Sequence, residues 1–265
     1  MKIKNTELKA TVLIANYNNA KYIDRCVNSV ITQSYKKLEI IFIDDSSTDD
    51  SLKVIKKYSK KIKVIKKNNK LGVGCFDQIE TYHEGFKKSK GKIIFLLDSD
   101  DFFKKEKISI LMNEFNKNKK NNILYDLPIK KFSKKKNLFI KKKNKLIKNY
   151  WPYFAPTSCI SFRRNKFKKI FSLINFRSYS DIWLDFRIGI VSIYIFKQYN
   201  FIEKNLTFYR QSENNISSGF KHISINWWRR RMQAHHFVKF FFLKHKIFYK
   251  KNLDYYATYF INLFL

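Results

Sequence analysis

Three carboxylates stand close together in this chain, at Asp98, Asp100 and Asp101, directly after the apolar run of residues 93–97. Like charges at this spacing repel one another unless a positive charge is held among them. Carboxylate oxygens, together with phosphate oxygens, are the ligands that Mg²⁺ and Mn²⁺ prefer. The sequence therefore predicts a divalent cation, Mn²⁺ or Mg²⁺, bound by Asp98 and Asp100. Asp101 is equally suited to capping a helix.

Polar and acidic side chains also follow two earlier apolar runs, each with the length of a buried strand. Asn16 to Asn18 end the first run, and Asp44 with Asp45 end the second. Segments with helical spacing of apolar residues lie between the runs, and this alternation predicts a parallel sheet with helices on both faces. Ligands bind at the carboxyl ends of such strands, so these side chains should meet in one crevice. The expected strands cover 10–18, 38–45, 62–67 and 92–101, and the expected helices cover 19–33, 46–60 and 76–91.

Composition narrows the class of protein. Hydrophobic residues make up 45% of the chain, which excludes a disordered protein despite the net charge of +34. Cys26, Cys75 and Cys159 are too far apart for a zinc or disulfide pattern and indicate a reducing compartment. No apolar run reaches the roughly 20 residues of a membrane span, and the N-terminus lacks a signal-peptide cleavage site. The sequence therefore predicts a cytoplasmic protein with an anionic partner.

Four motifs, in order along the chain, resemble those of the mostly inverting, GT-A-fold glycosyltransferases grouped as family 2. The resemblance runs from Ala10 to Ser218 and rests on VLIANYNNAKYIDRCVNSVITQSYKKLEIIFIDDSSTDDS, GKIIFLLDSDD, YSDIWLDFR and LTFYRQSENNIS. It implies an α/β, Rossmann-like GT-A fold with a mainly parallel central sheet flanked by helices. It also implies a catalytic domain at residues 1–220, followed by a basic, aromatic-rich helical extension at 221–265.

The same resemblance implies a metal-dependent inverting glycosyltransferase of the hexosyltransferase type, with a UDP-sugar as donor. Such a reaction needs a base that takes the proton of the attacking hydroxyl. Asp181, in the motif YSDIWLDFR, aligns with the catalytic base of the family. Asp185 lies one helical turn further on and is the rival base.

The donor side of the site is also implied residue by residue. Tyr17 is expected to lie against a pyrimidine base, and Asp44 or Asp45 is expected to accept its imide N–H. Arg210 either contacts phosphate or braces the acidic residues. The residues expected to bind the nucleotide sugar are Ala15, Tyr17, Asp44, Asp45, Asp98, Ser99 and Arg210.

The resemblance further implies an acceptor that is a glycan or a lipid-linked glycan, in the synthesis of capsule, lipooligosaccharide or a related bacterial surface glycan. The expected location is the cytoplasm, with peripheral contact at the inner face of the cytoplasmic membrane. The Trp, Phe, Arg and Lys residues of 226–251 fit an interfacial helix on an anionic membrane. They fit equally well a helix packed on the catalytic domain or a dimer contact.

Other classes of protein fit the sequence less well. A basic nucleic-acid-binding protein would explain the charge, but carboxylates gathered at strand ends would repel a phosphate backbone. A nucleotidyltransferase would normally have a glycine-rich loop after its first strand, and residues 15–23 contain no glycine. A catalytically degenerate relative is a further alternative, although both Asp100 and Asp181 are present. Nucleic acid is therefore not the expected partner.

Overall fold

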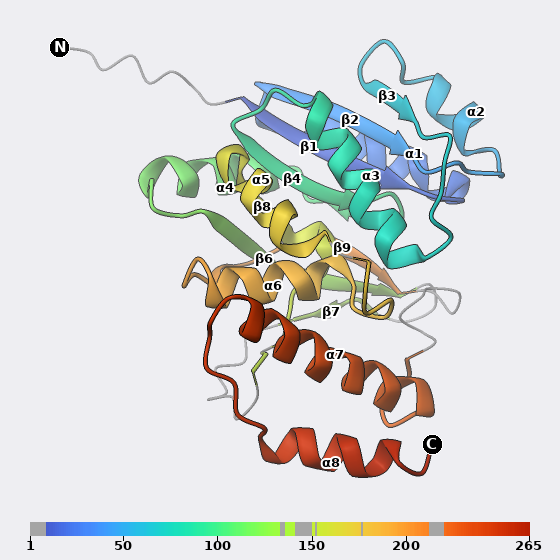
Figure 1. Ribbon diagram of the computed structural model, residues 1–265. Coiled ribbons are helices and arrows are strands. Elements are labelled where there is room, and N and C mark those ends of the chain that lie inside the picture. Colours follow the sequence, from blue (N-terminus) through green and yellow to red (C-terminus); the bar gives the residue numbers. More distant parts are fainter. Residues whose placement is uncertain (1–8, 133–135, 141–149, 152, 176, 212–219) are drawn as a thin grey trace.

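The structure is a computed structural model of the whole chain. It describes residues 9–132, 136–140, 150–151, 153–175, 177–211 and 220–265 (Figure 1). One sheet runs through these residues, with helices on both of its faces (Figure 1).

The N-terminal half of the sheet is parallel, as the alternation of strands and helices predicts. Its strands are β1 (Ala10–Asn16), β2 (Leu38–Asp44), β3 (Lys63–Lys66) and β4 (Ile93–Asp98), in the order β3-β2-β1-β4. The connecting helices are α1 (Ala20–Ile31), α2 (Ser51–Lys56) and α3 (Gly74–Lys88). In the register of β1, Asn16 pairs with Asp44 of β2 and Ala15 pairs with Asp98 of β4. The acidic strand ends therefore lie at one edge of the sheet.

The C-terminal half of the sheet mixes both strand directions. Beyond β4 it continues with β8 (Ile160–Arg163), β6 (Ile123–Phe132), β9 (Asn200–Gln211) and β5 (Phe102–Phe103), while β7 (Leu138–Phe139) pairs with β6. β8 is antiparallel to β4 and to β6, whereas β6 and β9 are parallel. The remaining elements are α4 (Lys107–Lys117), the 3₁₀ helix η1 (Thr157–Cys159), α5 (Arg164–Ile174), α6 (Leu184–Tyr194), α7 (Ile225–Lys244) and α8 (Leu253–Asn262).

Each face of the sheet has its own apolar core, because successive side chains of a strand point to opposite faces. In β1, Leu13 belongs to the core beneath α3, α5 and α6, while Val12 and Ile14 belong to the core beneath α1 and α4. α7 contributes Phe237 and Phe241 to the first core. α7 is therefore packed on the core of this face, which agrees with one of the alternatives that the sequence left open. The boundary at residue 220 stays a prediction.

The C-terminal helices form the outer layers on that side. In Figure 1, α7 lies below α6, and α8 lies below α7 at the edge of the molecule. His235 of α7 is buried and its Nε2 lies 3.0 Å from Oδ2 of Asp254 in α8. In the described part of the chain, no helix combines the length and the apolar character needed to cross a membrane.

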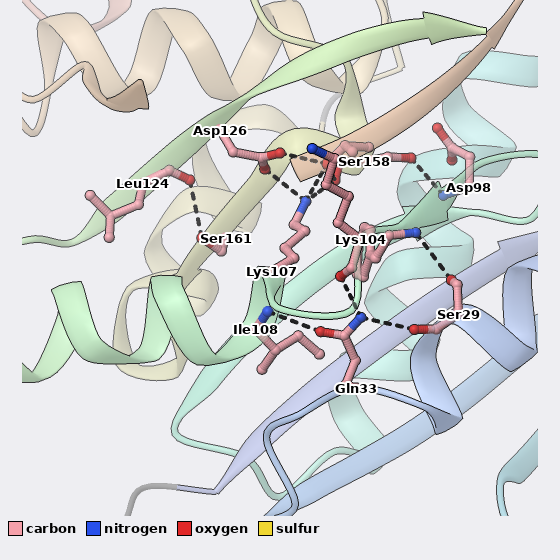
Figure 2. A network of polar contacts seen from close by, with 12 residues as sticks. Ser29, Gln33, Asp98, Lys104, Lys107, Ile108, Leu124, Asp126, Ser158 and Ser161 are labelled. Atoms are coloured by element: carbon pink, nitrogen blue, oxygen red, sulfur yellow. Dashed lines mark hydrogen bonds and ion pairs between the residues drawn. The ribbon is translucent and has the colours of Figure 1, made fainter. Parts of the chain in front are cut away.

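A buried polar network joins the two halves of the sheet (Figure 2). The Lys107 side chain is fully buried, and its Nζ lies 2.7 Å from Oδ1 of Asp126 and donates to the carbonyl oxygen of Ser158 at 2.7 Å. Thr207 donates to the other oxygen of Asp126 at 2.6 Å. Ser158 Oγ in turn accepts from the backbone N–H of Asp98 at 3.0 Å. The end of β4 is thus tied to α4, β6 and β9.

Candidate functional site

A cavity of about 690 Å³ opens at the carboxyl ends of β1, β2 and β4. The start of α6 and one side chain of α7 also line it. The residues predicted from the sequence that line it are Ala15, Tyr17, Asp45, Asp98, Ser99 and Asp100. Other lining side chains were not singled out as donor-site residues, among them Trp183, Asp185 and Arg230.

The turn after β4 holds the acidic cluster in place through backbone contacts. The Ser99 N–H donates to the carbonyl oxygen of Ala15 at 3.0 Å, which continues the pairing of β4 with β1. Asn19, just before α1, donates to Ser99 Oγ at 3.2 Å. Together with the bond from the Asp98 N–H to Ser158, these contacts fix Asp98 and Asp100 at the floor of the cavity.

The electrostatics of this cluster suit a cation. Tyr82 and Gln78 donate to Oδ1 of Asp98 at 2.9 Å and 3.1 Å, yet burial and the nearby Asp100 raise the pKa of Asp98 to about 7. Burial also raises the pKa of Asp100. Two partly buried carboxylates that repel each other are stabilised by a bound cation. A donor set made only of oxygens fits the hard ions Mg²⁺ and Mn²⁺.

Asp101 and Arg210 support the cluster from outside the lining of the cavity. The Arg210 backbone N–H donates to Oδ1 of Asp101 at 2.8 Å, and Arg210 Nε donates to the carbonyl oxygen of Asp100 at 2.9 Å. The Arg210 guanidinium also lies 4.1 Å from the ring centroid of Tyr22. Through these contacts Arg210 braces the acidic residues, and its contact with phosphate stays a prediction.

The two acidic residues after β2 have different surroundings. Asp44 is fully buried, and its carboxylate accepts from Asn16 Nδ2 at 2.9 Å and from the Ser47 N–H at 3.0 Å. Asp45 lines the cavity, and Lys67 Nζ lies 2.5 Å from its Oδ1. Asp44 therefore completes the turn after β2, whereas Asp45 is available to a ligand.

Tyr17 and Lys70 form the rim of the cavity beside Asp45. Lys70 Nζ lies 3.1 Å from the centroid of the exposed Tyr17 ring, a cation–π arrangement. Both residues line the cavity. An aromatic ring in this position provides a flat surface for a nucleotide base.

The two candidate bases differ in whether they line the cavity. Asp185, in the first turn of α6, lines the cavity, and its pKa is raised by burial against the opposing effect of Arg230. Asp181 does not belong to the described lining. Its carboxylate accepts from Gln233 Nε2 at 2.9 Å, and its N–H donates to Gln233 Oε1 at 3.1 Å. The geometry favours Asp185, the rival in the sequence-based assignment.

Arg187 determines how the loop before α6 turns toward the cavity. Its side chain is fully buried and donates to the carbonyl oxygens of Ile174, Ser178 and Ile182 at 2.9, 2.6 and 2.7 Å. Burial lowers the pKa of Arg187 to about 10. Because one side chain satisfies these three carbonyl groups, the loop has a fixed path, and α6 begins with Trp183 and Asp185 facing the cavity.

Arg230 comes from α7, and no sequence motif indicates that it belongs to the site. It is one of three consecutive arginines, of which Arg229 is exposed and Arg231 pairs with Asp254. Arg230 alone among them lines the cavity. Only the tertiary packing of α7 distinguishes it.

A second group of metal-binding side chain types lies on α3, at Glu80, His83 and Glu84, where one ligand atom from each lies within 4.8 Å of the others. None of these residues belongs to the described lining of the cavity. Glu84 also pairs with Lys87, and the His83 ring stacks on Phe171 at 3.6 Å between centroids. The cation that the sequence predicts at the acidic cluster stays a prediction.

Comparisons with known proteins agree with this geometry. The model of the family described as glycosyl transferase family 2 matches residues 11–171. An uncharacterized glycosyltransferase of Nostoc sp. is 30% identical over 220 residues, which are 77% of this chain and 65% of that protein.

Two solved structures are similar in fold. Staphylococcus aureus TarS 1-349 in complex with UDP-GlcNAc superposes with a TM-score of 0.60 at 18% identity, over 86% of this chain and 65% of that one. A mannosyltransferase of Pyrobaculum calidifontis, in complex with GDP-Man and Mn²⁺, superposes with a TM-score of 0.54 at 14% identity, over 89% and 64%. The likeness confirms the predicted GT-A fold. The chain spans about two thirds of each protein's length.

Proposed function

Because this chain belongs to glycosyl transferase family 2, we propose that it transfers a sugar from a nucleotide diphosphate donor, a UDP-sugar, to a hydroxyl group of a growing glycan. The observation that carries the proposal is one cavity lined both by an acidic cluster at the end of β4 and by a separate carboxylate, Asp185, at the start of α6. A donor site and a base in one cavity suit direct displacement, which inverts the anomeric centre.

On the donor side, Asp98 and Asp100 would hold a Mn²⁺ or Mg²⁺ ion. When bound, the ion would neutralise the charge that develops on the leaving diphosphate. Tyr17 would lie against the uracil ring, and Asp45, held by Lys67, would accept the imide N–H. Ala15 and Ser99 line the same part of the cavity and would contact the nucleoside.

On the acceptor side, Asp185 would take the proton of the attacking hydroxyl. A carboxylate that is largely removed from water is a stronger base than an exposed one, and burial raises the pKa of Asp185. Arg230 opposes that rise in the pKa of Asp185 and so favours the ionised carboxylate. Asp181, bonded to Gln233, remains the alternative base that the family resemblance implies.

The acceptor that we propose is a glycan or lipid-linked glycan of the bacterial surface, such as capsule or lipooligosaccharide. Lipid-linked acceptors would place the protein at the inner face of the cytoplasmic membrane. UDP-GlcNAc is the first donor to test, because the similar TarS structure contains it.

The experiment that tests the donor site is calorimetric binding of UDP with and without Mn²⁺. We expect Mn²⁺-dependent binding by the native protein and a loss of at least about tenfold in affinity for Asp100→Ala, equal to about 1.4 kcal/mol. Asp50→Ala, at an exposed acidic residue near α2, is the matched control and should bind UDP as the native protein does. No detectable binding of UDP, GDP or other nucleotides would contradict the proposal and favour a degenerate relative or a nucleic-acid-binding protein.

The role of Arg230 predicts a change in the pH profile of transfer. Arg230→Gln removes the positive charge that lowers the pKa of Asp185, so the pKa rises and the ionised base is lost at a higher pH. The acid limb of kcat should therefore move to higher pH, and Arg230→Lys should restore it. The other titratable groups that sense Asp185 are Asp98, Tyr125, Tyr153 and Tyr199, and all of them stay in the variant.

Arg229→Gln is the control for this experiment, because it removes the same charge from an exposed position of the same helix. An acid limb that stays in place in Arg230→Gln, with the rate lowered equally at every pH, would assign Arg230 a structural role only.

A further inference from the structure

The outward face of α8 is apolar and open to solvent. Leu253, Tyr256, Phe260 and Phe264 follow one another at helical spacing, and their exposed fractions are 84%, 55%, 62% and 74%. Leu263 and the C-terminal Leu265 extend the same surface. A contiguous apolar patch of this kind is uncommon on a soluble protein and usually marks a contact surface.

The orientation of α8 is fixed by its inner side. Asp254 is the one charged residue of the helix, and it points inward, where Arg231 Nε donates to its Oδ1 at 3.0 Å and His235 Nε2 lies 3.0 Å from its Oδ2. Tyr255 and Thr258 are buried against α7. Because the only charge of α8 is used to hold the helix, its outward face contains no charged side chain.

Basic residues border this face at the connection from α7. Lys246, Lys250 and Lys251 are exposed there, around Phe248, whose side chain is 84% exposed. Lys251 Nζ also lies 4.8 Å from the ring centroid of the buried Tyr255, so its charge is held beside α8. An apolar face with lysines along one border is the pattern of a helix that lies in the interface of an anionic membrane.

We propose that the outward face of α8 binds the surface of an anionic lipid bilayer, with its aromatic and leucine side chains among the acyl chains and the bordering lysines at the head groups. A second copy of the chain is the other occupant of comparable chemistry. The net charge of +34 and the basic border oppose that contact, because like charges would face each other. The charge complementarity favours the lipid.

This assignment differs from the interfacial helix at 226–251 that the sequence left open as one of three alternatives. The segment 226–251 has the composition of an interfacial helix, but α7 uses its apolar side chains, such as Phe237, Phe241 and Phe242, in the core. The face that remains open belongs to the next helix. The inference deepens the proposed function by naming the surface that would bring the cavity to lipid-linked acceptors.

The test is cosedimentation of the full chain with vesicles, in the absence of donor and acceptor. We expect binding to vesicles of phosphatidylcholine mixed with phosphatidylglycerol, weak binding to phosphatidylcholine alone, and weaker binding as salt increases. Phe260→Ser combined with Phe264→Ser should weaken binding to the mixed vesicles at least about tenfold, because two large apolar side chains no longer enter the bilayer.

The matched control is Leu138→Ser combined with Phe139→Ser, on β7, where the native side chains are 51% and 56% exposed. It should bind vesicles as the native protein does. Thermal unfolding of both variants checks that they are folded, and UDP binding is measured separately. Vesicle binding without UDP binding would contradict the proposed function alone, and the reverse would contradict the role of α8 alone.

Three results would overturn the inference. The first is no binding of the native chain to the mixed vesicles at low salt. The second is equal binding by the α8 variant, which would trace the attraction to the overall basicity of the chain. The third is a native dimer in sedimentation velocity that the α8 variant converts to monomer, because a second copy would then cover the face.

Discussion

Asp185→Asn should lower the rate of sugar transfer by about 10²- to 10⁴-fold, the usual contribution of a general base, while UDP binding stays intact. The amide has nearly the same shape as the carboxylate but cannot accept the proton of the acceptor hydroxyl. Because Asp185 is not one of the proposed metal or nucleotide ligands, its loss should leave the groups that bind UDP in place. The measurement is kcat with UDP-GlcNAc and a glycan acceptor, with calorimetric UDP binding in parallel.

Asp181→Asn is the matched control, in the loop just before α6 and with the same chemical change. We expect it to retain activity within a few-fold of the native rate, because the Asp181 carboxylate is engaged by Gln233 and does not belong to the described lining of the cavity. The opposite pattern, an inactive Asp181→Asn variant and an active Asp185→Asn variant, would support Asp181 as the base, as the family resemblance implies.

Lys107→Met should cause the largest loss of stability, about 3–5 kcal/mol in the free energy of unfolding. The substitution leaves Asp126 as a fully buried carboxylate without its partner, and burial already raises the pKa of Asp126 in the intact pair. Urea unfolding measures the effect. Lys117→Met is the control, because Lys117 pairs with Glu114 at the surface, at 3.5 Å, and such pairs contribute at most about 1 kcal/mol.

The buried network also makes a prediction about the site. Lys107 donates to the carbonyl oxygen of Ser158, whose hydroxyl accepts from the Asp98 N–H (Figure 2). Any Lys107→Met protein that remains folded should therefore bind UDP with Mn²⁺ more weakly than the native protein does. Equal loss of stability in Lys107→Met and Lys117→Met would contradict the prediction that the buried pair contributes more to the free energy of unfolding than the surface pair.

The parallel half of the fold could be predicted because its determinants are local. Apolar runs of strand length end in polar residues, and helical spacing separates them, so the four strands and their three connecting helices follow from the chain itself. The convergence of Ala15, Asp45 and Asp98 follows from the rule that parallel strands carry ligands at their carboxyl ends. The motifs that resemble family 2 extended this to the whole GT-A fold.

The second half of the sheet was harder to predict because its pairing is not local. β9 lies beside β6 and β5, which are distant in the sequence, and β8 runs antiparallel to its neighbours. The sequence of a single strand does not determine which other strand it pairs with. For the same reason the sequence could not decide between Asp44 and Asp45. Both follow the apolar run of β2, and only their different contacts, with Asn16 and with Lys67, distinguish them.

The residues of α6 and α7 that line the cavity could be identified only from the tertiary structure, for the same reason. Asp181 and Asp185 share one motif, and the path that the loop takes around Arg187 decides which of them faces the cavity. Arg230 is indistinguishable from its two arginine neighbours until α7 is packed on the core.

The position of Arg230 on α7 has a consequence for how the protein matures on the ribosome. Asp45, Lys70, Asp98 and Asp100 are all made early, so a nascent chain has these charged groups of the cavity lining long before α7 emerges. The guanidinium that faces Asp185 and the aromatic side chains that anchor α6 are made later, with α7. Translation therefore completes the acidic cluster first and adds the last charged group of the cavity lining near the end.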